Sequence, residues 1–310
     1  MFRDYVKIAR PDHWFKNVFM VPGMLLGWLA SPPENVISTF GWVLVGLMAT
    51  CLICSSNYTL NEFLDAATDR KHPQKRNRPA AAGRVKAFGV YVQWVFLAVA
   101  GLTLSWVVGG QFFVCEIALF VMGIVYNVPP VRSKDLPYLD VLSESINNPI
   151  RLLLGWYAVK CQFLPPATLV FAYWMLGAFL MTVKRFAELE CINNRTVATA
   201  YRKSFAHYTR NRLLICIVFY STAFAFFSGA FIIRYHIELI LAVPYFAGFL
   251  GFYLHLGMLP DSPTQYPETL YKERTFMIYT GLTVLMTIIC FFLHVPWLGR
   301  LFKSTIPGGL

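Results

Sequence analysis

The chain has 310 residues, of which 57% are hydrophobic, 16% aromatic and only 14% charged. A soluble globular domain carries about 25% charged residues, so this composition argues against a water-soluble enzyme and excludes a disordered chain. Lys and Arg number 27 against 16 Asp and Glu, a net charge of +11. In so apolar a chain a basic excess is typical of cytoplasmic membrane loops, so we expect an integral membrane protein that binds no nucleic acid.

Apolar runs that approach the roughly 20 residues of a spanning helix occur nine times. They cover approximately 15–30, 38–63, 88–108, 112–128, 146–159, 167–183, 213–233, 237–259 and 276–294. The first and fifth are short and contain Pro22 and Pro149, so we expect them to be tilted, broken or partly re-entrant. No strand-like alternation competes with this pattern. The sequence therefore predicts one all-α domain, 1–310, a polytopic bundle of about nine transmembrane helices.

The distribution of positive charge predicts the orientation. The amino terminus and the segments 64–87, 129–151, 184–212 and 260–275 hold 23 of the 27 Lys and Arg residues. By the positive-inside rule these segments lie in the cytoplasm, with the amino terminus inside and the carboxyl terminus outside. Most acidic residues lie on the same side, which favours a cytoplasm-facing site in the inner membrane. A transporter would place its ionisable groups nearer the midplane.

A first acidic motif lies at the end of the second span. Asn61, Asp65 and Asp69 are spaced by four residues and share one face of a helix. Two carboxylates one turn apart repel each other unless a cation lies between them. Mg²⁺ prefers one or two carboxylates together with substrate phosphates, so the motif predicts a magnesium site. The alternative is a solvated helix end that emerges from the bilayer.

Basic residues follow this motif directly. They suit the remaining phosphate oxygens of a metal-bound substrate, since Arg can form two parallel hydrogen bonds with a phosphate. Membrane anchoring by positive charge is the alternative. The candidates for substrate binding are Lys71, Lys75, Arg76, Arg78 and Arg84.

A second acidic cluster follows the fourth span. Asp140 and Glu144 are one helical turn apart, and Tyr126, Arg132 and Lys134 precede them. Two metal-binding faces, each with nearby cations, would hold one diphosphate from both sides.

A third candidate group ends the sixth span. Lys184 or Arg185 could hold a substrate phosphate while Glu188 orients the substrate or binds a hydroxyl. The alternative is an intrahelical ion pair between Lys184 and Glu188.

These motifs together resemble the UbiA superfamily of intramembrane transferases. The resemblance rests on the nine spans, on Asn61, Asp65 and Asp69 followed by the basic K-H-P-x-K-R-x-R-P stretch, and on the second acidic loop. Many relatives have D-x-x-x-D in that loop, where this chain has Glu144 at the last position. Glu can also bind Mg²⁺.

Further stretches narrow the resemblance. Three stretches resemble the decaprenyl-phosphate phosphoribosyltransferases. They are R-P-x-x-W-x-K-N at 10–17, K-R-x-x-E-L at 184–189, and R-K-S with Y-T within 202–209. The Y-x-x-P-P loop that begins at Tyr126 resembles instead relatives that prenylate aromatic or tetrapyrrole acceptors.

The resemblance implies transfer of 5-phosphoribose from phosphoribosyl diphosphate to a polyprenyl phosphate in the lipid bilayer, with loss of pyrophosphate. Mg²⁺ would be held by Asn61, Asp65, Asp69, Asp140 and Glu144, and Lys16, Asn17, Lys184 and Arg185 would contact the phosphates. The alternative is a prenyltransferase that joins a polyprenyl diphosphate to an aromatic acceptor. A lesser alternative is a lipid-phosphate transporter without catalysis. A homo-oligomer is compatible with either chemistry.

Overall fold

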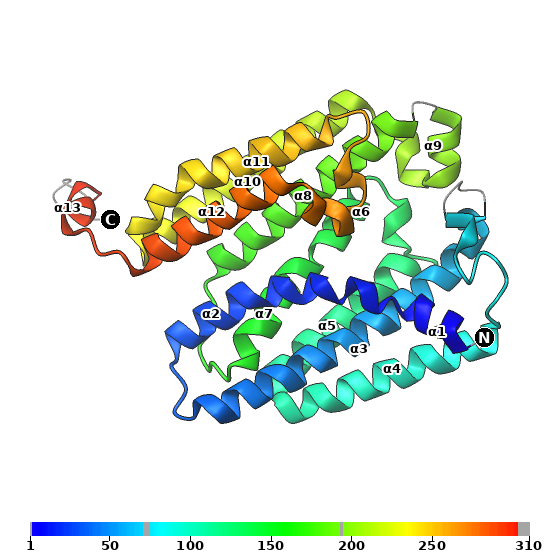
Figure 1. Ribbon diagram of the computed structural model, residues 1–310, viewed down its shortest axis with the longest axis horizontal. Coiled ribbons are helices and arrows are strands. Elements are labelled where there is room, and N and C mark those ends of the chain that lie inside the picture. Colours follow the sequence, from blue (N-terminus) through cyan, green and yellow to red (C-terminus); the bar gives the residue numbers. More distant parts are fainter. Residues whose placement is uncertain (1, 71–74, 193–194, 303–310) are drawn as a thin grey trace. The chain divides into compact units, whose positions relative to one another are not determined.

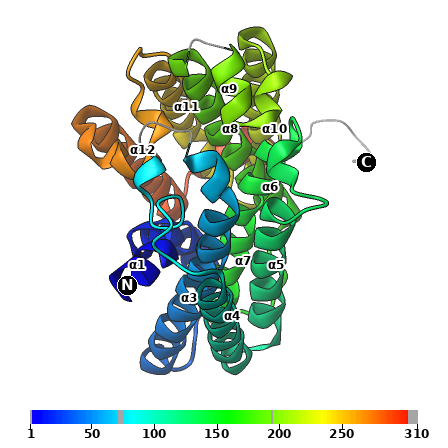
Figure 2. The ribbon, with the colours of Figure 1, turned by 90° about the vertical axis from the view of Figure 1, so that its right-hand side faces the viewer.

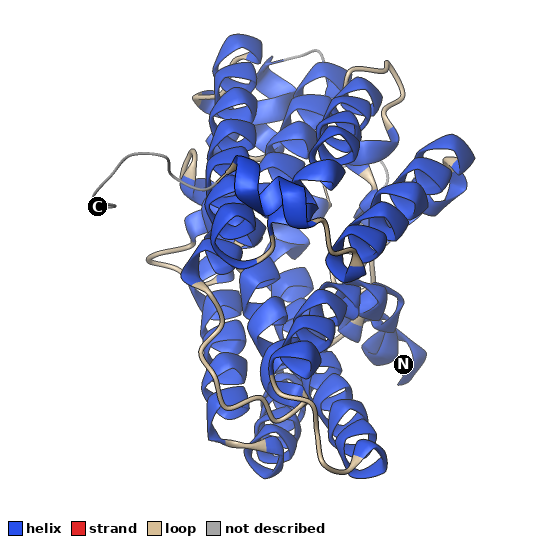
Figure 3. Ribbon diagram, turned by 90° about the vertical axis from the view of Figure 1, so that its left-hand side faces the viewer, coloured by secondary structure: helices blue, strands red, loops and turns tan. Residues whose placement is uncertain are grey.

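The computed structural model describes residues 2–70, 75–192 and 195–302, and the regular elements of this part of the chain are all helical (Figure 3). The described residues form two compact units. Unit 1 takes them from Met1–Pro165 and Ile192–Thr209, and unit 2 from Pro166–Cys191 and Arg210–Leu310.

Unit 1 is built around α3 (Val36–Asp69), a helix of 34 residues and so about 50 Å long. The side chain of Asn35 caps its start by accepting a hydrogen bond from the Ser38 amide at 2.9 Å. Figures 1 and 2 show α4 lying along α3. The other elements of the unit are α1 (Phe2–Ala9), the 3₁₀ helix η1 (Pro11–Met20), α2 (Val21–Ala30), η2 (Lys75–Asn77), α4 (Ala87–Val108), α5 (Gly110–Asn127), η3 (Ser133–Asp135), α6 (Leu139–Ser145), α7 (Asn147–Ala158), α9 (Arg195–Tyr201) and η4 (Lys203–Ala206).

The core of unit 1 lies where α3, α5 and α7 meet. Ile53, Phe112 and Leu154 are buried there, while large apolar side chains such as Phe88 and Phe96 on α4 are exposed. Exposed apolar surface of this extent on a helix of membrane-spanning length is the surface that lipid covers.

Unit 2 contains four long helical segments held together by aromatic contacts. These are α8 (Ala167–Ile192), α10 (Arg210–Tyr235), η5 (Ile237–Ala242) continued by α11 (Val243–Gly257), and α12 (Arg274–Phe292); the short elements are η6 (Pro263–Gln265), η7 (Pro267–Lys272) and α13 (Pro296–Leu301). Phe171 stacks on Phe227 with ring centres 5.2 Å apart, and Phe249 packs on Phe276 at 5.5 Å. Offset and tilted ring pairs of this kind stabilise helix contacts where lipid removes the hydrophobic driving force.

The predicted all-helical membrane fold is confirmed, but the count of nine spans is not. In the described chain seven helical segments are long and apolar enough to cross a membrane. The first and fifth predicted spans, which were the short ones, are not among them. They correspond to η1 with α2 and to α7, and these elements pack against each other.

Two glycines make the contact between α2 and α7 close. A Cβ atom at Gly23 would lie 1.9 Å from the carbonyl oxygen of Leu152, and one at Gly155 would lie 1.9 Å from the carbonyl oxygen of Met20. Both neighbouring atoms belong to the backbone, so no change of side-chain rotamer can move them away. Small residues at helix interfaces allow this approach in membranes, and here they position η1 against α7.

We therefore expect Gly155→Ala to lower the unfolding free energy by about 1–3 kcal/mol, because the added methyl group forces α2 and α7 apart. Thermal unfolding in detergent measures the change. Gly41→Ala, on α3, is the control, since no heavy atom lies within 4 Å of that position. A Gly155→Ala protein with the midpoint of the wild type would contradict the observed packing.

Candidate functional site

Asp65, near the end of α3, is held by two cations from a single loop. The Arg132 guanidinium donates to Asp65 Oδ1 at 2.9 Å, and the Lys134 ammonium donates to the same oxygen at 2.6 Å. This loop lies between α5 and α6, so the structure brings together the first motif and the basic residues that precede the second. A carboxylate with two cations beside it is a place where phosphate oxygens and a metal ion can exchange partners.

An amide network extends this cluster. The Lys134 ammonium also donates to Asn127 Oδ1 at 2.8 Å, and the Asn61 side-chain amide donates to the same oxygen. Lys134 is only 6% exposed, and this burial lowers its pKa to about 8, although the neighbouring Asp65 limits the shift. Lys134 therefore carries its charge at neutral pH.

Asp69, one turn further along α3, faces a different partner. Its Oδ2 accepts a hydrogen bond from Arg78 Nη1 at 2.7 Å. Arg70 donates to the Ala81 carbonyl oxygen at 2.9 Å, so the basic segment folds back over the end of α3. Arg78 is thus placed at the acidic motif, and its contact with a substrate phosphate stays a prediction.

The remaining predicted residues of the basic stretch are less closely engaged. Arg84 is exposed and is bound to Asp4 at 3.1 Å, and Arg76 is exposed. Lys75 is partly buried, and Lys71 lies outside the described residues. Their predicted contacts with phosphate stay predictions.

Glu62 belongs to this end of α3 and was missed by the sequence reasoning. It is buried, its Oε2 lies 3.7 Å from Arg10 Nε, and its Oε1 accepts a hydrogen bond from the Ala80 amide at 3.5 Å. It ties the start of η1 and the basic segment to α3. The sequence signal that could have indicated a role for Glu62 was its position directly after Asn61 in the first acidic motif.

Asp140 has protein partners where the sequence predicted a metal ion. The side chain is fully buried, and its oxygens accept hydrogen bonds from Tyr208 at 2.6 Å, Ser204 at 3.2 Å and Arg202 at 3.5 Å. The Tyr208 hydroxyl also accepts from the Tyr138 amide at 2.7 Å. The segment after α9 returns to unit 1 and covers this carboxylate. A metal role for Asp140 stays a prediction.

Glu144, one turn along α6, accepts a hydrogen bond from the Tyr126 hydroxyl at 2.8 Å. The two predicted residues are therefore paired with each other. Tyr126 also lies beside Lys134, with 5.8 Å between the ammonium and the ring centre. A metal role for Glu144 stays a prediction.

Three non-glycine residues around this end of unit 1 adopt left-handed backbone angles. The φ values are 51° for Arg10, 33° for Arg132 and 68° for Tyr138. Such angles are disfavoured for residues with a Cβ and persist where the surroundings hold them. Asp65 provides that restraint for Arg132.

Lys16 and Asn17 lie on η1, beside α3. The Lys16 ammonium is 5.8 Å from the Tyr58 ring centre. Asn17 is buried, donates to Cys51 Sγ at 3.2 Å and accepts from Arg151 Nε at 3.1 Å. The sequence reasoning placed Arg151 only as a loop cation and missed this contact.

Lys184, Arg185 and Glu188 lie on α8 in unit 2. Arg185 is buried and its Nη1 lies 3.0 Å from Glu188 Oε2. An intrahelical ion pair at a spacing of three residues therefore exists between Arg185 and Glu188, while the predicted alternative was a pair between Lys184 and Glu188. Their predicted contacts with substrate stay predictions.

The chemistry of the donor set decides whether magnesium fits. Among the described residues no group of three His, Cys, Asp or Glu side chains is placed to hold a metal ion. Mg²⁺ commonly takes one or two carboxylates and completes its shell with substrate phosphates and water. Asp65 and Asp69 fit this requirement, and the oxygens of the buried Asp140 already accept hydrogen bonds from three side chains.

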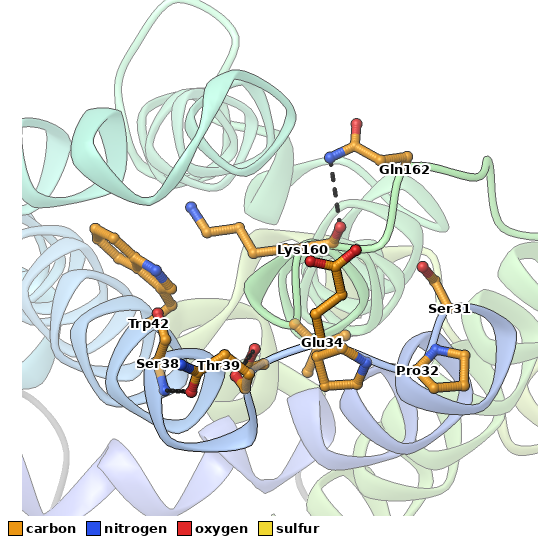
Figure 4. A pocket seen from close by; sticks show the side chains of 11 residues that line it. Ser31, Pro32, Glu34, Ser38, Thr39, Trp42, Lys160 and Gln162 are labelled. Carbon is orange, nitrogen blue, oxygen red and sulfur yellow. Dashed lines mark hydrogen bonds between the residues drawn. The ribbon is translucent and has the colours of Figure 1, made fainter.

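A cavity of about 490 Å³ lies at the opposite end of α3 in unit 1 (Figure 4). The Lys160 ammonium lies 4.2 Å above the Trp42 ring centre and donates to the Val108 carbonyl oxygen. None of the predicted site residues lines this cavity.

Comparison with known proteins identifies the family of the chain. Residues 19–276 match the model of the UbiA prenyltransferase family. The chain belongs to this family.

Two curated relatives differ in the reaction that their names state. The chain is 31% identical over 208 residues to a decaprenyl-phosphate phosphoribosyltransferase of Mycolicibacterium smegmatis, covering 67% of this chain and 63% of that protein. It is therefore matched to less than two thirds of that relative's length. It is 24% identical over 227 residues to a protoheme IX farnesyltransferase of Klebsiella pneumoniae, covering 72% and 74% of the two chains.

The fold has a solved counterpart. A UbiA homologue of Archaeoglobus fulgidus, bound to GPP and Mg²⁺, matches 94% of this chain and 100% of its own with a TM-score of 0.70 at 16% identity. This chain is thus a UbiA-family protein whose described part contains seven helical segments long and apolar enough to cross a membrane.

Removal of the Tyr208 hydroxyl should loosen the segment that covers Asp140. Tyr208→Phe deletes a donor to a buried carboxylate and the acceptor of the Tyr138 amide, so we expect a loss of about 1–3 kcal/mol of stability. Amide hydrogen exchange across 203–208 should become faster. Tyr271→Phe, at an exposed position, is the control. Unchanged exchange in the Tyr208 variant would show that these hydrogen bonds do not hold the segment.

Proposed function

We propose that this UbiA-family transferase moves 5-phosphoribose from phosphoribosyl diphosphate to a polyprenyl phosphate and releases diphosphate. The observation that carries the proposal is the convergence of Arg132 and Lys134 on Asp65, with Asp69 and Arg78 one turn away. A diphosphate needs both charges and directional donors, and this end of unit 1 supplies them. The name of the mycobacterial relative supports phosphoribose as the transferred group.

The chemistry demands little from the protein besides charge and position. A phosphate oxygen of the acceptor forms a bond to C1 of the ribose, while the bond from C1 to the diphosphate oxygen breaks. The acceptor phosphate is already an anion, so no general base is needed. Catalysis then depends on holding two anions together and on stabilising the leaving group.

Each side chain of the site has a part in this account. Arg132 and Lys134 would turn from Asp65 to the diphosphate oxygens, and Arg78 would do the same from Asp69. Asp65 and Asp69 would hold Mg²⁺, which when bound supplies the charge that neutralises the diphosphate. Asp140 acts as a positioning residue, because it fixes the covering segment through Tyr208 and Ser204.

We also propose the membrane orientation that the distribution of Lys and Arg in the sequence predicts. The acidic end of α3 would face the cytoplasm, from which the water-soluble donor enters. The lipid acceptor would lie within the bilayer with its phosphate at the same end.

Prenyl transfer to an aromatic acceptor is the second candidate. The farnesyltransferase relative and the loop of Tyr126 support it. The same carboxylates and cations would hold the diphosphate, which in this case would leave an allylic carbon. A transporter without catalysis is not proposed, because the chain is a transferase by family.

Paired assays on the purified protein separate the two reactions. Labelled phosphoribosyl diphosphate with a polyprenyl phosphate should place label in the lipid phase, and chelation of divalent cations should abolish the transfer. A polyprenyl diphosphate with an aromatic acid should give no product. Product from the second pair alone would overturn the proposal.

Asp65→Asn should lower kcat for the transfer by on the order of 100-fold or more, because removal of one charged group at the leaving diphosphate weakens stabilisation of the transition state. Glu34→Gln is the matched control, since Glu34 is exposed at the opposite end of α3. A folded Asp65→Asn protein with the wild-type kcat would contradict the assignment.

A further inference from the structure

Arg151 is a buried cation that lacks a carboxylate partner in the described part of the chain. It lies on α7 and is 7% exposed. Its Nε donates to Asn17 Oδ1 at 3.1 Å, its Nη1 to the Asn147 carbonyl oxygen at 3.3 Å, and its Nη2 to Cys54 Sγ at 3.3 Å. None of these acceptors carries a formal negative charge.

The hydrogen-bonding capacity of Arg151 is only partly used. A guanidinium has five N–H donors, and a cysteine sulfur is a weak acceptor. Three donors have partners here, and one of the three is that sulfur. An unpaired buried charge in a membrane bundle is expensive, and such residues mark functional sites. Arg151 can therefore form an ion pair and further hydrogen bonds with an anionic ligand.

Two further cations lie beside Tyr58, which is a neighbour of Arg151. Tyr58 on α3 is close enough to Arg151 for an electrostatic interaction. The Lys16 ammonium and the Arg10 guanidinium each lie 5.8 Å from the Tyr58 ring centre. Asn17, next to Lys16 on η1, accepts a hydrogen bond from Arg151.

The acidic residues of this region have other hydrogen-bond partners, although Glu116 interacts with Arg151 electrostatically at longer range and its buried Oε2 atom has no hydrogen-bond partner among the described residues. Glu62 faces Arg10, Glu144 accepts from Tyr126, and Glu116 on α5 accepts from the Thr50 hydroxyl. None of these carboxylates forms an ion pair with Arg151 among the described residues.

Asn147 adds a further polar group on the same face of α7. It lies four residues before Arg151, one helical turn away. Its Oδ1 atom is buried and has no hydrogen-bond partner among the described residues. Its Nδ2 donates to the Glu144 carbonyl oxygen at 3.0 Å, which fixes the orientation of the amide. This position can therefore accept a hydrogen bond from a hydroxyl of the ligand.

The position along α3 indicates what the anion is. Tyr58 precedes Asp65 by seven residues, or about 10 Å along the helix. In the proposed transfer two phosphate monoesters lie across the ribose from the leaving diphosphate. They are the 5-phosphate of the donor and the head of the lipid acceptor. A second anion site deeper than Asp65 suits either.

We propose that Arg151, with Asn17 and Lys16, forms a second anion subsite that binds a phosphate monoester of one of the two substrates. The inference rests on the proposed phosphoribosyl transfer. Arg151 would exchange its contact with Cys54 for two parallel hydrogen bonds to phosphate oxygens, the geometry that guanidinium groups favour.

Steady-state kinetics with each substrate varied in turn test the subsite. We expect Arg151→Gln to raise KM for one substrate at least tenfold and to change the other less than twofold, with Arg151→Lys in between. A higher KM for polyprenyl phosphate would show that the subsite binds the phosphate of the lipid. A higher KM for phosphoribosyl diphosphate would show that it binds the 5-phosphate of the donor. Lys160→Met removes one cation at the opposite end of unit 1 and is the control. A lower kcat with both KM values within twofold of the wild type would overturn the proposal.

Asn17→Asp provides a variant that does not depend on the loss of Arg151. It places a carboxylate against the guanidinium with almost no change in shape, so the fold should be at least as stable. The internal anion should compete with the phosphate and raise the same KM. A purely structural role of Arg151 predicts no such rise. An Asn17→Asp protein with both wild-type KM values would overturn the subsite.

Ligand-induced thermal shifts separate failure of this inference from failure of the proposed reaction. A short-chain prenyl phosphate or ribose 5-phosphate, each without a second substrate, should raise the melting temperature of the wild type but not of Arg151→Gln. A shift in a protein that performs no phosphoribosyl transfer would retain the subsite and reject the reaction. No shift in the wild type with either compound would overturn the subsite.

Discussion

The ion pairs of Asp65 with Arg132 and Lys134 are the interaction on which the rest of unit 1 depends. A carboxylate near the end of a long membrane helix is costly unless it is paired, and both cations come from the loop between α5 and α6. The pairing fixes that loop, including the left-handed backbone of Arg132. Through Lys134 and Asn127 it also joins α3 to α5. The same charges that stabilise the fold are those that a diphosphate and its metal would use.

Charged and polar residues form two groups at different depths along α3, here called the outer and the inner level. The outer level contains Asp65, Asp69 and their cations. The inner level contains Arg151 and Asn17, held between η1, α3 and α7 by the glycine contacts of α2 with α7. A transferase that joins two anions needs a binding site for each, and in the proposed reaction the outer and inner levels would supply them.

The sequence was informative where a periodic pattern carries the signal. The spacing of Asn61, Asp65 and Asp69 predicted one helical face, and the apolar runs predicted the membrane helices. The partners were not predictable in the same way, because contacts between residues far apart in the chain depend on packing. Tyr208 meets Asp140 across 68 residues and Arg151 meets Asn17 across 134. Arg151 was counted as an ordinary loop cation because only the fold shows that it is buried.

Binding of pyrophosphate to the purified protein, measured by calorimetry with and without Mg²⁺, tests the central claim most directly. If Asp65 and Asp69 exchange their cations for a metal-bound diphosphate, affinity should be at least tenfold higher with Mg²⁺ than without it. Lys134→Met should weaken binding in the presence of the metal. Equal affinity with and without Mg²⁺ in the wild-type protein would contradict the account.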